Sequence, residues 1–97
     1  MKGWEYIMIL EADVRDLNVK TRKFRNAGKT IGIVERTDGK SIPISMTRSQ
    51  VDKYLGRFGL NENMVIKLNG EEIKTTIIKV DRDVLLHYAH HIQLKEV

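Results

Sequence analysis

The side chains best able to do chemistry in this 97-residue chain are basic ones crowded into a single segment. Residues 20–32 (KTRKFRNAGKTIG) carry five basic side chains and no acid. Lysine and arginine neutralise phosphate groups, and the planar arginine guanidinium can contact one phosphate through two hydrogen bonds. A basic run of this kind is equally typical of a solvated helix face. Charge alone therefore leaves both interpretations open.

The placement of charge favours localised contact with a polyanion. Residues 15–29 contain six basic residues and one acid, whereas the whole chain has a net charge of +4, so the rest of it is close to neutral. Three of the six are arginine, the residue best suited to bidentate phosphate contact. Gly28 and Gly32 flank Lys29 and would let a phosphate approach the backbone. A basic patch on a nearly neutral body indicates a nucleic-acid partner.

Three histidines in the segment HYAHHIQL form a second group of candidates. On a strand His87 and His91 would share one face while His90 points the other way, so the three would not converge on a metal ion. Structural zinc sites use four ligands, usually with cysteine, and the chain has no cysteine. We therefore expect no metal and no cofactor. Partly exposed polar residues are the favoured interpretation, and histidine contact with an RNA sugar or base is the alternative.

Enzyme signatures are absent from the sequence. It has no phosphate-binding loop, dinucleotide fingerprint or nucleophile elbow, and its acids are scattered. We therefore expect a protein that is not an enzyme and has no small-molecule substrate. No stretch approaches the roughly 20 apolar residues of a membrane span, and the start (MKGWEYIMILEAD) is too short for a secretion signal. The lack of cysteine fits a reducing compartment, so we expect a cytoplasmic protein without a membrane partner.

The first predicted elements surround the basic segment. Residues 5–14 are rich in β-branched and aromatic types and predict a strand. Asn18 is a candidate cap for a short helix over 19–27, and Gly28 stands where a glycine ends a helix. The aromatic residues Trp4, Tyr6 and Tyr88 could stack on bases, although lone aromatics in a small domain more often belong to its core or rim.

The middle of the chain predicts a hairpin and an amphipathic helix. Asp38-Gly39 favours a type I′ turn between two short strands, and Pro43 places the second strand at a sheet edge or a bulge. Thr47 and Gln50 have the spacing of a capping box. The helix that follows carries apolar residues at helical spacing and ends at Gly59; these residues are Val51, Tyr54, Leu55 and Phe58.

The last third predicts a second hairpin and a final strand. Asn69-Gly70 forms the turn, with Met64, Ile66 and Leu68 alternating before it, and the final strand covers about 84–95. The fold class is therefore α+β and mainly β. We expect residues 1–97 to form one domain, a small six-stranded antiparallel barrel with two or three short helices.

Several segments occur in the order seen in a known family. They are EADVR, the basic TRKFRNAGK, a hydrophobic strand, SIPIS, a helix, VIKLNGEEI, VDRD and HHIQL. From about Leu10 to the C-terminus the chain resembles the bacterial large-subunit ribosomal proteins numbered twenty-five. This 5S rRNA-binding family includes the general stress protein Ctc. The chain resembles a short, single-domain and diverged form, without the additional C-terminal domain of longer members.

The resemblance implies a non-enzymatic barrel that binds 5S rRNA in the large ribosomal subunit and is a monomer when free. Arg15 matches an RNA-contacting arginine of the first strand, Arg82 matches an arginine late in the chain, and His91 matches the histidine of the terminal motif. Arg22 and Arg25 match the basic helix, where Lys23 stands at a usual arginine. With the lysines of the charge pattern, the expected RNA-binding residues are Arg15, Lys20, Arg22, Lys23, Arg25, Lys29, Arg82 and His91.

Three positions depart from the family pattern. Ile31 stands at the family's proline, Glu35 at its tyrosine and Gln93 at its aspartate. Glu35 brings a negative charge that phosphate repels to a position expected near RNA. These departures keep an alternative open. The alternative is a diverged paralogue outside the ribosome that acts as a general, stress-related RNA- or protein-interaction module.

Overall fold

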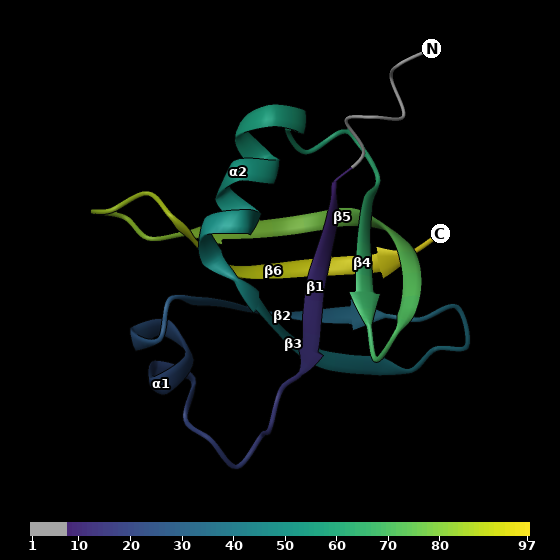
Figure 1. Cartoon of the computed structure of the whole chain (residues 1–97), viewed down its shortest axis with the longest axis horizontal. Coiled ribbons are helices and arrows are strands. Elements are labelled where there is room, and N and C mark those ends of the chain that lie inside the picture. Colours follow the sequence, from purple (N-terminus) through teal and green to yellow (C-terminus); the bar gives the residue numbers. More distant parts are fainter. Residues whose placement is uncertain (1–7) are drawn as a thin grey trace.

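Alternation of apolar and polar residues along the chain produces a closed barrel of six strands with two helices (Figure 1). The computed structural model describes residues 8–97. The strands are β1 (Ile9–Val14), β2 (Lys29–Glu35), β3 (Ser41–Thr47), β4 (Met64–Leu68), β5 (Glu71–Arg82) and β6 (Ala89–Glu96), and the helices are α1 (Thr21–Asn26) and α2 (Arg48–Phe58). The predicted mainly β class with six strands is confirmed.

The order of the strands around the barrel is β1-β3-β2-β6-β5-β4. The hairpin pairs β2–β3 and β4–β5 are antiparallel, as are β1–β3 and β5–β6. The remaining pairs, β1–β4 and β2–β6, are parallel. The expectation of a purely antiparallel barrel is therefore wrong in this detail. The parallel pairs join strands far apart in the sequence, which no turn signal announces.

The core fills the barrel from alternate positions of every strand. Its fully buried side chains include Leu10 of β1, Val34 of β2, Ile44 of β3, Ile66 of β4 and Leu94 of β6. Val51, Tyr54 and Leu55 of α2 belong to the same cluster. The predicted apolar face of α2 is thereby confirmed. No helix in the described part of the chain has the length and apolar character needed to cross a membrane.

The ends of the helices differ partly from the sequence prediction. Gly28 and Gly59 follow α1 and α2 with φ of 76° and 71°, as expected for glycines that end helices. Thr47 is the N-cap of α2, but its side chain makes no capping hydrogen bond. The Arg48 amide at that end donates to the Gly28 carbonyl instead, at 2.9 Å. The predicted capping box is therefore wrong in its bonding.

The loop before α1 also corrects the sequence prediction. The Asn18 amide donates to Asp16 Oδ1 at 2.9 Å, which keeps Asn18 in a turn before the helix. Lys20 is the N-cap, so the predicted helix over 19–27 is too long and its cap is wrong. The predicted strand over 5–14 is confirmed for Ile9–Val14. Its residues 5–7, like Trp4, lie outside the described residues.

The two hairpin turns have different outcomes. Asn69 and Gly70 have φ of 52° and 83°, which confirms the type I′ turn. At the other hairpin Gly39 has φ of 88°, and the Arg36 amide donates to the Lys40 carbonyl across three connecting residues. A type I′ turn needs positive φ at both central residues, which Asp38 does not have. The prediction of that turn type is therefore wrong.

Pro43 lies in β3, which pairs with β1 on one side and with β2 on the other in an unbroken register, so the predicted sheet edge or bulge is wrong. The proline stands at the point where β1 stops pairing with β3. Its carbonyl accepts the Arg15 amide at 2.9 Å, so the proline nitrogen faces the same side, beyond the end of β1. A missing N–H donor costs little there.

The final strand begins later than predicted, at Ala89 in place of residue 84. The Asp83 carboxylate accepts the amides of Leu85 and Leu86 at 2.9 and 2.8 Å, which closes a turn. His87 follows with φ of 64° and lies in this connection. The predicted sharing of one strand face by His87 and His91 is therefore wrong.

Candidate nucleic-acid interface

Helix α1 presents the basic segment to solvent. Arg22, Lys23 and Arg25 are exposed, and Lys20 is exposed at the N-cap. Lys29, which is half-buried, begins β2 directly after Gly28. Because α1 has no buried residue, its arginines and lysines are available to a polyanion. The structure therefore brings five of the eight predicted residues together.

A second part of the candidate interface lies on the outer surface of the barrel. Arg15 follows β1, and its amide donates to Pro43 of β3. Pro43 pairs with Ile33 of β2, which pairs with Gln93 of β6. His91 points the same way as Gln93, two residues earlier on β6. Arg15 and His91 therefore share the outer face of the barrel, and the Arg15 charge acts on the His91 imidazole.

Arg15 has one unusual atom. Its Nε is buried and has no hydrogen-bond partner, although the side chain as a whole is half-exposed. A buried donor without a partner costs free energy, so an acceptor supplied by a bound molecule would be favourable there. This is the kind of contact that a phosphate or sugar oxygen makes.

The surroundings of His91 keep its imidazole neutral near pH 7. Burial lowers its pKa below the usual value, and the charges of His90, Arg15 and Lys79 lower it further. Asp81, paired with His91 across β5 and β6, opposes this effect. Its Oδ2 lies 3.8 Å from His91 Nδ1. A neutral imidazole both donates and accepts hydrogen bonds, which suits contact with a ribose hydroxyl or a base edge.

Arg82 ends β5, one residue after Asp81, and is exposed. Its Nη1 donates to the His87 carbonyl at 3.2 Å. Arg82 therefore lies at the base of the β5–β6 connection, next to the His91 region along the same pair of strands.

Arg48, which the sequence prediction missed, connects these regions. Its guanidinium lies 3.9 Å from the centre of the Tyr88 ring. Its Nη1 donates to the Arg25 carbonyl at 3.3 Å, so one side chain joins the end of α1 to the β5–β6 connection. A cation in the first turn of a helix opposes the helix dipole, which marks Arg48 as unusual in the sequence but does not indicate its partners.

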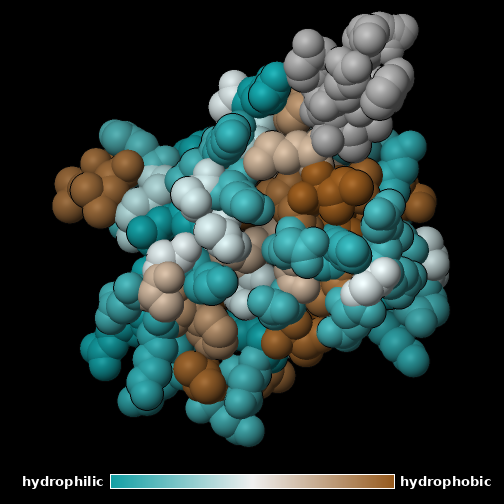
Figure 2. Space-filling model, in the orientation of Figure 1, coloured by the Kyte–Doolittle hydropathy of each residue, from teal (hydrophilic) through white to brown (hydrophobic). Residues whose placement is uncertain are grey.

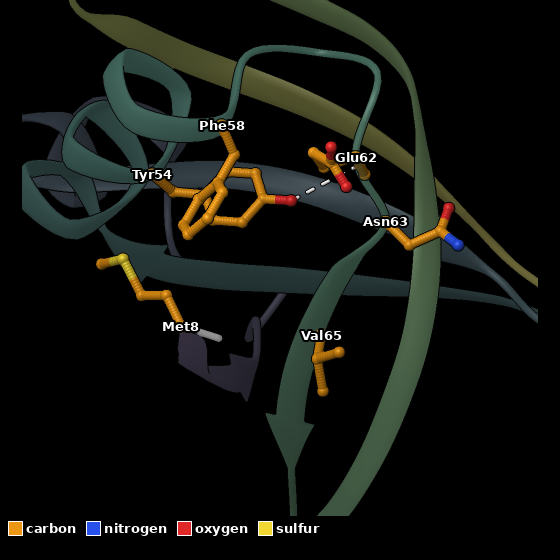
Figure 3. A pocket seen from close by; sticks show the side chains of 6 residues that line it. All are labelled: Met8, Tyr54, Phe58, Glu62, Asn63 and Val65. Atoms are coloured by element: carbon orange, nitrogen blue, oxygen red, sulfur yellow. Dashed lines mark hydrogen bonds between the residues drawn. The ribbon is translucent and has the colours of Figure 1, made fainter. Parts of the chain in front are cut away.

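A small cavity lies elsewhere, between the end of α2 and β4. It measures about 90 Å³ and is lined by Met8, Tyr54, Phe58, Glu62, Asn63 and Val65 (Figure 3). Tyr54 Oη donates to the Glu62 carbonyl at 3.4 Å, and burial raises the pKa of this tyrosine. None of the predicted RNA-binding residues lines this cavity. Within residues 8–97, no group of three or more metal-ligating side chains could hold a metal ion.

Comparison with known proteins identifies the family. The model of the ribosomal L25p family matches residues 10–94, nearly the whole chain. The chain belongs to the ribosomal L25p family. It is 25% identical over 87 residues to the large ribosomal subunit protein bL25 of Exiguobacterium sibiricum. That alignment covers 90% of this chain and 38% of the relative, so the chain spans well under half of the relative's length.

Glu35 and Gln93, two of the residues that depart from the L25p family pattern, both lie on strands of the barrel. Glu35 is exposed at the end of β2 and pairs with Lys95 of β6, whose cation can offset the carboxylate. Gln93, half-buried, pairs with Ile33 and with Lys79. Both lie on the outer surface that carries His91. The roles of all eight predicted RNA-binding residues remain predictions.

Proposed function

We propose that this protein is a non-enzymatic constituent of the large ribosomal subunit that binds 5S rRNA through a basic face. The observation that carries the proposal is the match to the ribosomal L25p family over residues 10–94. Ribosomal proteins of this family are typically structural and not catalytic. The name of the relative, a large ribosomal subunit protein, supports placement in the same subunit. The relative is a much longer protein than this chain, so its role is proposed for this chain and not transferred.

The geometry supports two kinds of RNA contact within the barrel, which acts as one binding domain: neutralisation of phosphates and directional hydrogen bonds. The exposed cations of α1 and the half-buried Lys29 neutralise RNA phosphates. Arg15, with its unpartnered Nε, and the neutral His91 supply directional hydrogen bonds to sugar or base edges. Arg82 contacts RNA beside them. In this proposal the free protein is a monomer, its location is the cytoplasm, and it needs neither cofactor nor membrane.

A titration of 5S rRNA and of an unrelated duplex RNA tests the proposal. We expect tighter binding to 5S rRNA at every salt concentration, with affinity falling by several orders of magnitude as salt rises, because several phosphate contacts release counterions. Equal affinity for the two RNAs would refute specific 5S rRNA binding. A flat salt response would refute the role of the basic face.

Glu35 and Gln93 favour a second candidate, a diverged module that acts on RNA or protein outside the ribosome. The variants Glu35→Tyr and Gln93→Asp restore the family residues and separate the two candidates. A large gain in 5S rRNA affinity supports divergence from the ribosomal role. No change means that Lys95 and the neighbouring residues tolerate both substitutions, and it favours the ribosomal role.

A further inference from the structure

The connection between β5 and β6 ends in three exposed aliphatic side chains. Val84, Leu85 and Leu86, here called the apolar tip, are 86%, 84% and 70% exposed. In Figure 2 a hydrophobic cluster projects from the left edge of the molecule, where Figure 1 shows the end of this connection. Three consecutive large apolar residues at a protruding end are costly in water, which indicates a binding surface.

The tip is held in a defined shape by hydrogen bonds within the β5–β6 connection. The Asp83 amide donates to the Tyr88 carbonyl and the His87 amide to the Asp83 carbonyl, both at 2.9 Å. The amides of Leu85 and Leu86 donate to Asp83 Oδ1. These amides are therefore not free to pair with the strand of a partner, and the tip offers its side chains instead. A preorganised tip loses little conformational entropy on binding.

Arginines stand at the base of the tip. Arg82 donates to the His87 carbonyl, and the Arg48 guanidinium lies over Tyr88. Arg48 also donates to Arg25 of α1, so the tip is continuous with the basic helix. In Figure 2 the hydrophilic side chains around α1 project at the lower left, on the same side as the tip. An apolar point with cations at its base matches the layout of a nucleic acid, where phosphates flank stacked bases.

We propose that the apolar tip inserts into RNA as a wedge, between two bases or against the shallow minor groove, while the adjacent arginines contact the flanking phosphates. The proposal rests on the proposed 5S rRNA binding. Nucleic-acid-binding proteins use leucine and other aliphatic side chains to open base steps in this way. The wide, shallow minor groove of A-form RNA admits such a projection. The arginine-rich base favours RNA over an apolar groove on a protein or a lipid surface.

A double variant, Leu85→Ser with Leu86→Ser, tests the wedge. The control is Leu60→Ser, an exposed leucine that follows the opposite end of α2. We expect the double variant to bind 5S rRNA about tenfold more weakly than the wild type, because it loses apolar burial. The slope of affinity against salt should stay unchanged, since no phosphate contact is removed. The control should bind like the wild type.

A site-directed probe locates the tip on the RNA. The chain has no cysteine, so Val84→Cys carries a single tethered hydroxyl-radical source and keeps both leucines. We expect cleavage of 5S rRNA within a few adjacent nucleotides, and no cleavage there from a probe at Leu60→Cys. If the wild type binds 5S rRNA and the Val84→Cys probe cuts nothing, the wedge alone is wrong.

Other outcomes are also decisive. If the wild type does not prefer 5S rRNA, the proposed function is wrong and the wedge is wrong with it. Unchanged RNA binding by the double variant, together with lost binding to anionic vesicles, would overturn the wedge in favour of a lipid surface. Unchanged RNA binding together with lost binding to isolated large-subunit proteins would overturn it in favour of a protein groove.

Discussion

Replacement of the two arginines of α1 gives a quantitative test of phosphate contact. Arg22 and Arg25 are exposed, and no described contact holds their side chains, so Arg22→Ala with Arg25→Ala should leave the fold intact. Each phosphate contact to a duplex contributes about 0.9 to the slope of log affinity against log salt. Losing two contacts should therefore reduce that slope by about 1.8. The wild type binds more tightly than the variant at low salt, and this advantage should shrink about twelvefold when the salt concentration rises from about 50 to about 200 mM.

The assay is fluorescence anisotropy with labelled 5S rRNA at four or more salt concentrations. The control variant, Lys40→Ala with Lys74→Ala, removes the same charge from two exposed lysines. Lys40 lies in the β2–β3 turn, at the other end of the barrel from α1 in Figure 1. The control should keep the wild-type slope. Parallel salt plots for the wild type and the α1 variant would refute the reasoning, because α1 would then touch no phosphate.

Three further predictions concern the barrel and its links. Gly32→Ala should lower the free energy of unfolding by about 1–3 kcal/mol, measured by urea titration, because a Cβ there would clash with the Ile92 carbonyl oxygen on β6. An unchanged urea midpoint would contradict the β2–β6 register. His91 has a lowered pKa in the fold, so the wild type should lose stability as pH falls from about 6.5 toward that lower pKa, and His91→Gln should not. Thermal melts across this range test it, and identical pH profiles would contradict the burial of the imidazole. Arg48→Lys keeps the charge but loses the stacking on Tyr88, so 5S rRNA affinity should fall by about two- to fivefold; equal affinity would show that this link is irrelevant to binding.

Local signals predicted the parts of the fold that depend on neighbours in sequence. Asn69-Gly70 gave the correct turn because both residues tolerate positive φ and the strands need two connecting residues. Asp38-Gly39 is a similar turn signal, but β2 ends at Glu35 and β3 begins at Ser41, so the connection is longer than two residues and the turn type differs. The parallel pairing of β2 with β6 joins segments about sixty residues apart, and no local pattern encodes it.

Side-chain bonding to the backbone explains most of the remaining errors. Asp16 accepts a hydrogen bond from the Asn18 amide, and α1 begins only after this turn, at Thr21. Asp83 accepts the amides of Leu85 and Leu86, and β6 begins only after this second turn, at Ala89. These bonds are local, from an aspartate to an amide two or three residues later, and they compete with helix or strand hydrogen bonds at the same residues. The sequence permits both arrangements, so it does not fix the residue at which the helix or strand begins. The basic residues of α1 were predictable from charge. Arg48 was not, because its partners, Tyr88 and the Arg25 carbonyl, come together only in three dimensions.

The central claim is that this protein resides on the large ribosomal subunit through 5S rRNA. Sedimentation of extracts from its own cells, followed by detection of the protein in each fraction, tests this most directly. The account predicts that the protein co-sediments with large subunits and is released when 5S rRNA is extracted from them. Recovery at the top of the gradient, or with particles that lack 5S rRNA, would contradict it.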